Sequence, residues 1–150
     1  MVEIQNLTAS YVDVSFVRRV VRETLQSSGM YGIIGVGVVF VGTARMRRLN
    51  TTYHHENRVT DVLSFPASPT FFIPKFYGES YLGEIVVCAP YLKKQALDTR
   101  APYRTMLAHV LIHGTLHLMG YEHDVGGANS TRMHHREEKI MKKLGIEFGQ

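Results

Sequence analysis

The chain has 150 residues and a mass of 17.0 kDa, which is enough for one domain with a buried core. Hydrophobic residues make up 45% and charged residues 20% of the chain, and this balance excludes wholesale disorder. The single cysteine, Cys88, excludes a disulfide framework within the chain and a zinc site built from several cysteines. The sequence shows no signal peptide and no apolar run long enough to span a membrane, so we expect a cytoplasmic protein without membrane association.

Two features of the composition are unusual. Lys and Arg number 17 against 13 Asp and Glu, which gives a net charge of +4, and eight residues are histidine. The basic excess is concentrated between Arg18 and Arg58, a segment that contains seven arginines and only two acidic residues. A basic region of this kind is compatible with nucleic-acid binding but is also typical of solvated helix faces.

Hydrophobic periodicity predicts strands and helices that follow one another along a single domain. In chain order, the sequence predicts a strand within residues 1–10, a helix from Asp13 to about Ser28, a buried strand at Gly32–Val41, a short helix at Ala44–Thr52, strands at Thr60–Phe65 and Leu82–Cys88, and helices at Pro90–Asp98, Pro102–Met119 and from Asn129 or Ser130 to about Leu144. This pattern predicts an α/β or α+β fold with a small sheet, without ordering the strands.

Capping residues and loops delimit these elements. Asp13, Thr43 and Asn129 or Ser130 are candidate N-caps, and Pro102 suits the first position of a helix. Residues His54–Val59 are predicted to form a polar loop. Residues 66–80 hold three prolines and are predicted to form a long loop.

Four histidines fall close together, at positions 109, 113, 117 and 123. His113 and His117 are four residues apart and therefore share one face of a helix. Gly120 is suited to end that helix, so that His123 can fold back as a third ligand. Three neutral imidazoles with one open position describe a catalytic zinc site, and we expect one Zn²⁺ per chain.

The residue that follows the first ligand is Gly114, where zinc proteases with similar spacing carry a glutamate as general base. The reactive group predicted here is therefore a zinc-bound water, with no side-chain base assigned. A structural metal closed by Glu122 or Asp124 is the alternative. His109 is expected to pack in the core rather than to support the ligands, and His54, His55, His134 and His135 are expected to be solvated, unless the loop at His54 reaches the metal.

The stretch HGTLHLMGYEH from His113 to His123 resembles the signature of the YbeY-type endoribonucleases, the bacterial rRNA maturation factors. Leu49, Asn50 and Tyr53 followed by TDVLSFP at residues 60–66, and LGEIV at residues 82–86, are similar to two further family blocks. The resemblance implies a single α/β domain over residues 1–150, with a small mixed sheet and a zinc site at the end of a cleft. It also implies cleavage of single-stranded RNA, maturation of the 3′ end of 16S rRNA, ribosome quality control and contact with small-subunit ribosomal proteins.

One position departs from the family pattern. The family usually has an arginine directly after the tyrosine of the second block, and this chain has His54 there. Arg58, or His54 when protonated, could supply the cation that contacts RNA phosphate. The bidentate phosphate contact of an arginine at position 54 is lost in either case. His54, Arg58 and Ser64 are therefore the candidate substrate-binding residues. Four aromatic residues of the long loop, Phe71, Phe72, Phe76 and Tyr77, could stack on bases, but packing onto the loop's own core is favoured.

Three functions remain open from the sequence. The first is a zinc-dependent endoribonuclease. The second is a zinc hydrolase of another substrate, for which Gly114 disfavours a peptidase. The third is an RNA- or ribosome-binding protein whose metal is only structural. The sequence does not determine the oligomeric state.

Overall fold

Four strands form one mixed sheet in the computed structural model, which describes residues 1–30, 34–67, 80–121 and 128–147. The strands are β1 (Val2–Asn6), β2 (Ile34–Val41), β3 (Val62–Pro66) and β4 (Ser80–Cys88), in the spatial order β1-β2-β4-β3. β1, β2 and β4 are parallel, and β3 runs antiparallel to β4. The prediction of an α+β fold with a small mixed sheet is confirmed.

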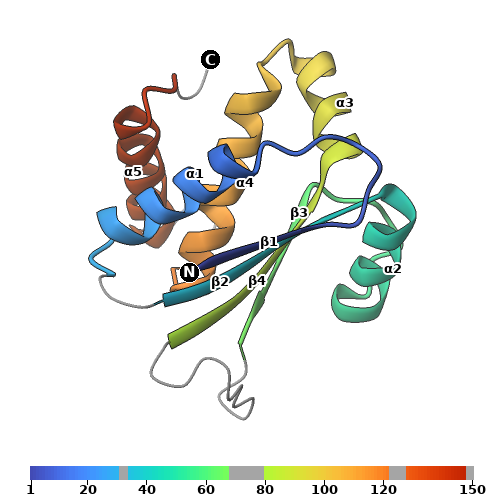
Figure 1. Cartoon of the computed structure of the whole chain (residues 1–150), viewed down its shortest axis with the longest axis horizontal. Helices are drawn as coiled ribbons and strands as arrows, with labels where there is room; N and C mark the ends of the chain where they lie inside the picture. The colour runs from blue at the N-terminus through green and yellow to red at the C-terminus, as the bar shows by residue number, and fades with distance from the viewer. Residues whose placement is uncertain (31–33, 68–79, 122–127, 148–150) are drawn as a thin grey trace.

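Helices cover both faces of this sheet (Figure 1). They are α1 (Val14–Ser27), α2 (Thr43–His54), α3 (Ala89–Thr99), α4 (Tyr103–Leu118) and α5 (Ala128–Lys143). α1, α4 and α5 lie on one face, and α2 lies on the other (Figure 1). No helix in the described part of the chain is long and apolar enough to cross a membrane.

The alternation of side chains along β2 explains the two layers. Val36, Val38 and Phe40 point to one face and belong to the main core, which α1, α4 and α5 cover. Val41 points to the other face and joins a smaller cluster that contains Met46 of α2. β2 is buried along its length because both faces are covered, as expected for a central parallel strand.

The beginning of α1 follows the prediction. The Asp13 carboxylate accepts a hydrogen bond from the Phe16 backbone N–H at 3.1 Å, so Asp13 is the N-cap. Val17, Val20 and Val21 recur at helical spacing and are fully buried. The helix therefore has the boundaries that its pattern indicates.

Several predicted boundaries are wrong. Thr43 is the first residue of α2 and Gly42 is its N-cap, without a side-chain hydrogen bond. α5 begins at Ala128, so neither Asn129 nor Ser130 precedes the helix as a cap. Pro102 is the N-cap of α4 rather than its first residue, since its ψ of 134° is extended.

Two further boundaries bear on the candidate site. α2 extends to His54, which is therefore helical rather than part of a loop, and His55 ends the helix in the left-handed conformation. β3 begins at Val62, two residues later than predicted, and the Asp61 carboxylate accepts the N–H of this first strand residue at 2.8 Å. Pro66 belongs to the strand. Most of the predicted long loop, residues 68–79 with its four aromatic residues, lies outside the described residues.

Candidate metal centre and adjoining pocket

His113 and His117 lie one turn apart on α4 and face each other. Their Nε2 atoms are 3.0 Å apart, and their ring centroids are 4.5 Å apart. Leu111, Ile112 and Leu116 of the same helix are fully buried and fix its orientation against the sheet and the neighbouring helices. The predicted pairing of these two imidazoles on one helix face is confirmed.

The two ring nitrogens suit a shared metal ion. In a tetrahedral zinc site with Zn–N bonds of about 2.0–2.1 Å, neighbouring ligand nitrogens are roughly 3.3 Å apart, so only a few tenths of an ångström of adjustment is needed. Gly120 has a φ of 98° and turns the chain at the end of α4, as predicted, and its N–H donates to the His117 carbonyl at 3.0 Å. His123, the third predicted ligand, lies outside the described residues, as do Glu122 and Asp124. Within the described ranges, no group of three potential ligands is assembled.

A buried carboxylate on α5 bridges two of the histidines. Glu137 Oε1 is 3.0 Å from His113 Nδ1, and Glu137 Oε2 is 3.0 Å from His109 Nε2. The Glu137 side chain is 4% exposed. Burial would raise the pKa of this carboxyl, but the hydrogen bonds and charge interactions with both histidines outweigh it and hold the pKa at about 2. Glu137 is therefore ionised at neutral pH.

Sequence reasoning missed Glu137 and misplaced His109. The expectation that His109 packs in the core is wrong, because its side chain is 45% exposed and bound to Glu137. A signal for Glu137 was present in the sequence, since it falls on the buried face of α5 together with Met133, Ile140 and Met141. A charged residue on an apolar helix face needs a partner, and the nearby histidines supply it.

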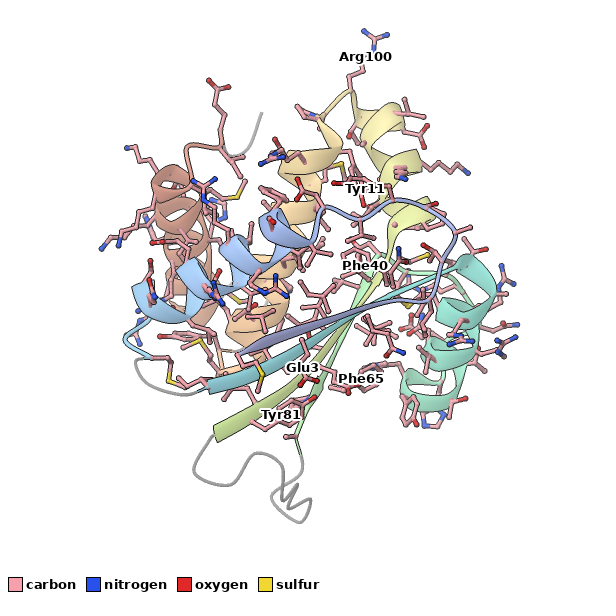
Figure 2. All side chains as sticks on the ribbon, viewed as in Figure 1. Glu3, Tyr11, Phe40, Phe65, Tyr81 and Arg100 are labelled. Atoms are coloured by element: carbon pink, nitrogen blue, oxygen red, sulfur yellow. The ribbon has the colours of Figure 1, made fainter. Side chains whose placement is uncertain are left out.

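A pocket of about 510 Å³ adjoins the histidine pair. It is lined by His113 and His117 of α4, by His54 at the end of α2, and by Ser64 and its neighbours on β3. The His54 ring also lies 6.3 Å from the Phe65 ring. Figure 2 shows the Phe65 side chain extending from β3 toward α2. His54 is exposed, as expected for a solvated side chain, and it also lines this pocket beside the histidine pair.

Arg58 does not line this pocket. Its guanidinium Nε forms an ion pair with the Glu56 carboxylate at 2.5 Å, and 69% of its side chain is exposed. This pairing raises the pKa of Arg58. Of the candidate substrate-binding residues, the structure thus brings His54 and Ser64 to the pocket, whereas Arg58 is exposed, paired with Glu56 and absent from the pocket lining.

The arginines between positions 18 and 58 do not form one continuous surface. A separate depression on the surface of α1 is lined by Arg18, Arg19 and Arg22. α1 covers the face of the sheet that carries the main core. The arginines of α2 lie beyond the opposite face of the sheet (Figure 1). The described residues that line the histidine pocket include none of these seven arginines. α1 and α2 lie on opposite sides of the sheet (Figure 1), so their arginines are separated by it.

Gly114 allows α4 to pack closely on the sheet beside the histidines. A Cβ atom at this position would lie 3.0 Å from Ile85 Cγ2 and 3.2 Å from Ser64 Oγ. Ser64 Oγ also donates a hydrogen bond of 3.5 Å to the Gly114 carbonyl. A glutamate side chain at position 114 would therefore collide with β3 and β4, which is a packing reason for glycine at this point in the motif.

Comparisons with known proteins agree with the sequence motifs. The family model described as endoribonuclease YbeY matches residues 3–145. A protein of Roseiflexus sp. (strain RS-1) named endoribonuclease YbeY is 34% identical over 140 residues, which is 92% of this chain and 88% of that protein. A protein of Acinetobacter baumannii with the same name is 30% identical over 129 residues, 86% of this chain and 82% of that protein.

A solved structure has a similar fold. The solution structure of a Thermotoga maritima protein superposes with a TM-score of 0.63 at 24% sequence identity. The match covers 97% of this chain and 92% of that protein. At this level of identity, the comparison establishes the shared fold.

Proposed function

This chain belongs to the endoribonuclease YbeY family, and from that premise we propose that it is a metal-dependent enzyme that hydrolyses phosphodiester bonds of single-stranded RNA. The observation that carries the proposal is the pair of facing imidazoles, with Nε2 atoms 3.0 Å apart, beside a pocket large enough for part of a nucleotide chain. The proposed location is the cytoplasm, and the proposed substrate is rRNA, with maturation of the 3′ end of 16S rRNA and contact with small-subunit ribosomal proteins as the family resemblance implies.

The proposed metal ligands are His113, His117 and His123, and the proposed metal is one Zn²⁺ per chain. The donor set fits, because imidazole nitrogen is a common zinc ligand and the two described imidazoles already converge. When bound, such an ion lowers the pKa of a water molecule or polarises a phosphoryl oxygen. Three protein ligands leave a position open for that purpose.

His54 and Ser64 are proposed to contact the RNA. His54 can donate a hydrogen bond from its imidazole to a phosphate oxygen, and the Ser64 hydroxyl can do the same when it leaves its long bond to the Gly114 carbonyl. Arg58 is proposed as a more distant electrostatic contact, because its guanidinium is paired with Glu56 outside the pocket. No side chain is assigned as the general base.

The packing of Gly114 argues against the peptidase alternative. The protease base would have to project from this position, where even a Cβ atom meets Ile85 and Ser64 at 3.0–3.2 Å. A reaction in which the substrate supplies more of the chemistry, as RNA can through its 2′-hydroxyl, suits a site without that glutamate.

The test is cleavage of a labelled single-stranded RNA by the zinc-loaded protein, with a duplex of the same sequence and a casein substrate in parallel. We expect cleavage of the single strand, loss of cleavage with a chelator, and recovery when zinc is restored. His117→Ala should abolish both zinc binding and cleavage, and His54→Ala should weaken cleavage while zinc binding persists. His135→Ala is the matched control, because His135 is an exposed histidine of α5 away from the pocket.

Three results would contradict the proposal. Cleavage that persists in His117→Ala or in chelator would show that the histidine site does not carry the activity. Tight RNA binding that survives chelation without cleavage would favour a binding protein with a structural metal. Hydrolysis of casein without hydrolysis of RNA would favour a peptidase.

A further inference from the structure

Glu137 is the only acidic or basic residue among the buried residues in the described part of the chain. Its backbone position on α5 is held by Met133, Ile140 and Met141, each at most 1% exposed. A buried carboxylate destabilises a fold unless it is hydrogen-bonded to a partner. Its two oxygens each meet one imidazole nitrogen at 3.0 Å, so both acceptor oxygens have a partner.

The contact with His113 selects which ring nitrogen carries the proton. An ionised carboxylate only accepts hydrogen bonds, so Nδ1 of His113 must donate to Glu137 Oε1. In the neutral ring, the lone pair is then on Nε2, which is the atom that faces His117 Nε2. A metal can bind only the nitrogen that carries the lone pair.

His109 completes the arrangement from the other side. It lies one turn before His113 on α4, and its Nε2 reaches Glu137 Oε2. With both oxygens engaged, the carboxylate cannot rotate about its terminal bond without breaking a hydrogen bond. α4 and α5 are thereby joined at the level of the histidine pair.

We propose that Glu137 is a positioning residue that fixes the tautomer and ring orientation of His113 for metal binding, and that His109 holds the Glu137 carboxylate in place. The inference rests on the proposed function and deepens it. Carboxylates and carbonyls that receive the second N–H of a metal-bound histidine typically change metal affinity by about 10–100-fold when they are removed.

The first experiment measures the zinc dissociation constant of the full chain by competition with a chromophoric chelator. We expect Glu137→Gln to weaken zinc binding by about 10-fold and Glu137→Ala by up to about 100-fold. Glu138→Gln is the matched control, because it removes the neighbouring, exposed carboxylate of the same helix and should leave affinity unchanged. His109→Gln should weaken binding less than Glu137→Ala, since Oε1 still accepts from His113.

The second experiment reads the tautomer directly in the metal-free protein. Long-range ¹H–¹⁵N correlation spectra should show His113 protonated at Nδ1 in the wild type and in Glu138→Gln, and a mixture of tautomers in Glu137→Ala. Urea unfolding in chelator reports whether each variant folds, and Glu137→Gln, which keeps the side-chain shape, serves if Glu137→Ala does not fold. A purely structural residue would lower stability without changing the tautomer.

The two proposals fail in different ways. If the wild type binds no zinc or cleaves no RNA, the proposed function fails, and the tautomer measurement still tests Glu137. If the wild type binds zinc and Glu137→Gln binds it equally tightly, with an unchanged His113 tautomer in Glu137→Gln and in the folded alanine variant, the positioning role is refuted.

Discussion

Replacing Gly114 with alanine tests whether close packing, rather than chemistry, requires glycine within the histidine motif. Helix propensity alone predicts that alanine in the middle of α4 would stabilise the protein by about 1 kcal/mol. The structure predicts the opposite sign. The new methyl group would lie 3.0 Å from Ile85 Cγ2 and 3.3 Å from Ile85 Cγ1. Carbon atoms in favourable contact are about 3.5–4.0 Å apart.

Relieving these contacts requires α4 to move away from the sheet or Ile85 to leave its preferred rotamer. Overpacking of this kind costs about 1–3 kcal/mol, so the net destabilisation expected for Gly114→Ala is about 1 kcal/mol after the gain in helix propensity. In an Ile85→Ala background, Cγ1 and Cγ2 of Ile85 are absent and only the contact with the rotatable Ser64 hydroxyl at 3.2 Å remains, so the same substitution should become neutral or stabilising by up to about 1 kcal/mol. The expected coupling between the two positions is therefore about 1–2 kcal/mol.

The assay is urea unfolding of the four proteins of this double-mutant cycle, all in chelator so that metal binding does not contribute. Zinc affinity of Gly114→Ala is measured in parallel, and it should fall if α4 shifts relative to α5. The steric argument would be refuted if Gly114→Ala raised the free energy of unfolding in the wild-type background. It would also be refuted if the substitution had the same effect with Ile85 and with Ala at position 85. Glycine at this position would then need a chemical explanation.

Three further predictions follow from particular contacts. The pKa of Glu137 falls from 4.5 to about 2 on folding, so its ionised form stabilises the folded protein above pH 4.5, and this contribution is lost as the pH falls toward 2. In urea titrations, the free energy of unfolding of the metal-free wild type should fall by about 3 kcal/mol more than that of Glu137→Gln over this range. Parallel pH curves for the two proteins would contradict this. Gly83→Ala should lower the free energy of unfolding by at least about 3 kcal/mol, because Gly83 has a φ of 136° and a Cβ atom there would lie 2.2 Å from a carbonyl oxygen of β3. A melting temperature within about 4 °C of wild type would be inconsistent with that contact. Arg58→Ala should leave the urea midpoint unchanged, since its pair with Glu56 is exposed, and should reduce RNA cleavage less than His54→Ala; the reverse order of activity would place Arg58 in the substrate path.

The pattern of secondary structure was largely readable from the sequence because its signals are local. Asp13 caps α1 and Gly120 turns the chain after α4, and each acts within a few residues of itself. One error lies where two neighbouring residues compete for the same cap. Thr43 was expected to cap α2 because threonine is a good N-cap residue, but Gly42 takes that position and Thr43 joins the helix.

The spacing of His113 and His117 by itself determined that two imidazoles share one face, because residues four apart on a helix do so in any fold. The glycine between them likewise separated this motif from the zinc proteases. The order of the strands was not readable, since parallel pairing joins segments that are far apart in the chain.

Tertiary structure decided which other residues surround the histidine pair. Glu137 is 24 residues from His113 in sequence, and His54 is still farther away, so their positions depend on how α5 and α2 pack against the rest of the fold. Arg58 is only four residues beyond His54, yet the end of α2 places one at the pocket and leaves the other with Glu56 in solvent. Local periodicity fixes the direction of a side chain on its own helix, whereas the contacts between helices depend on the packing of the whole core.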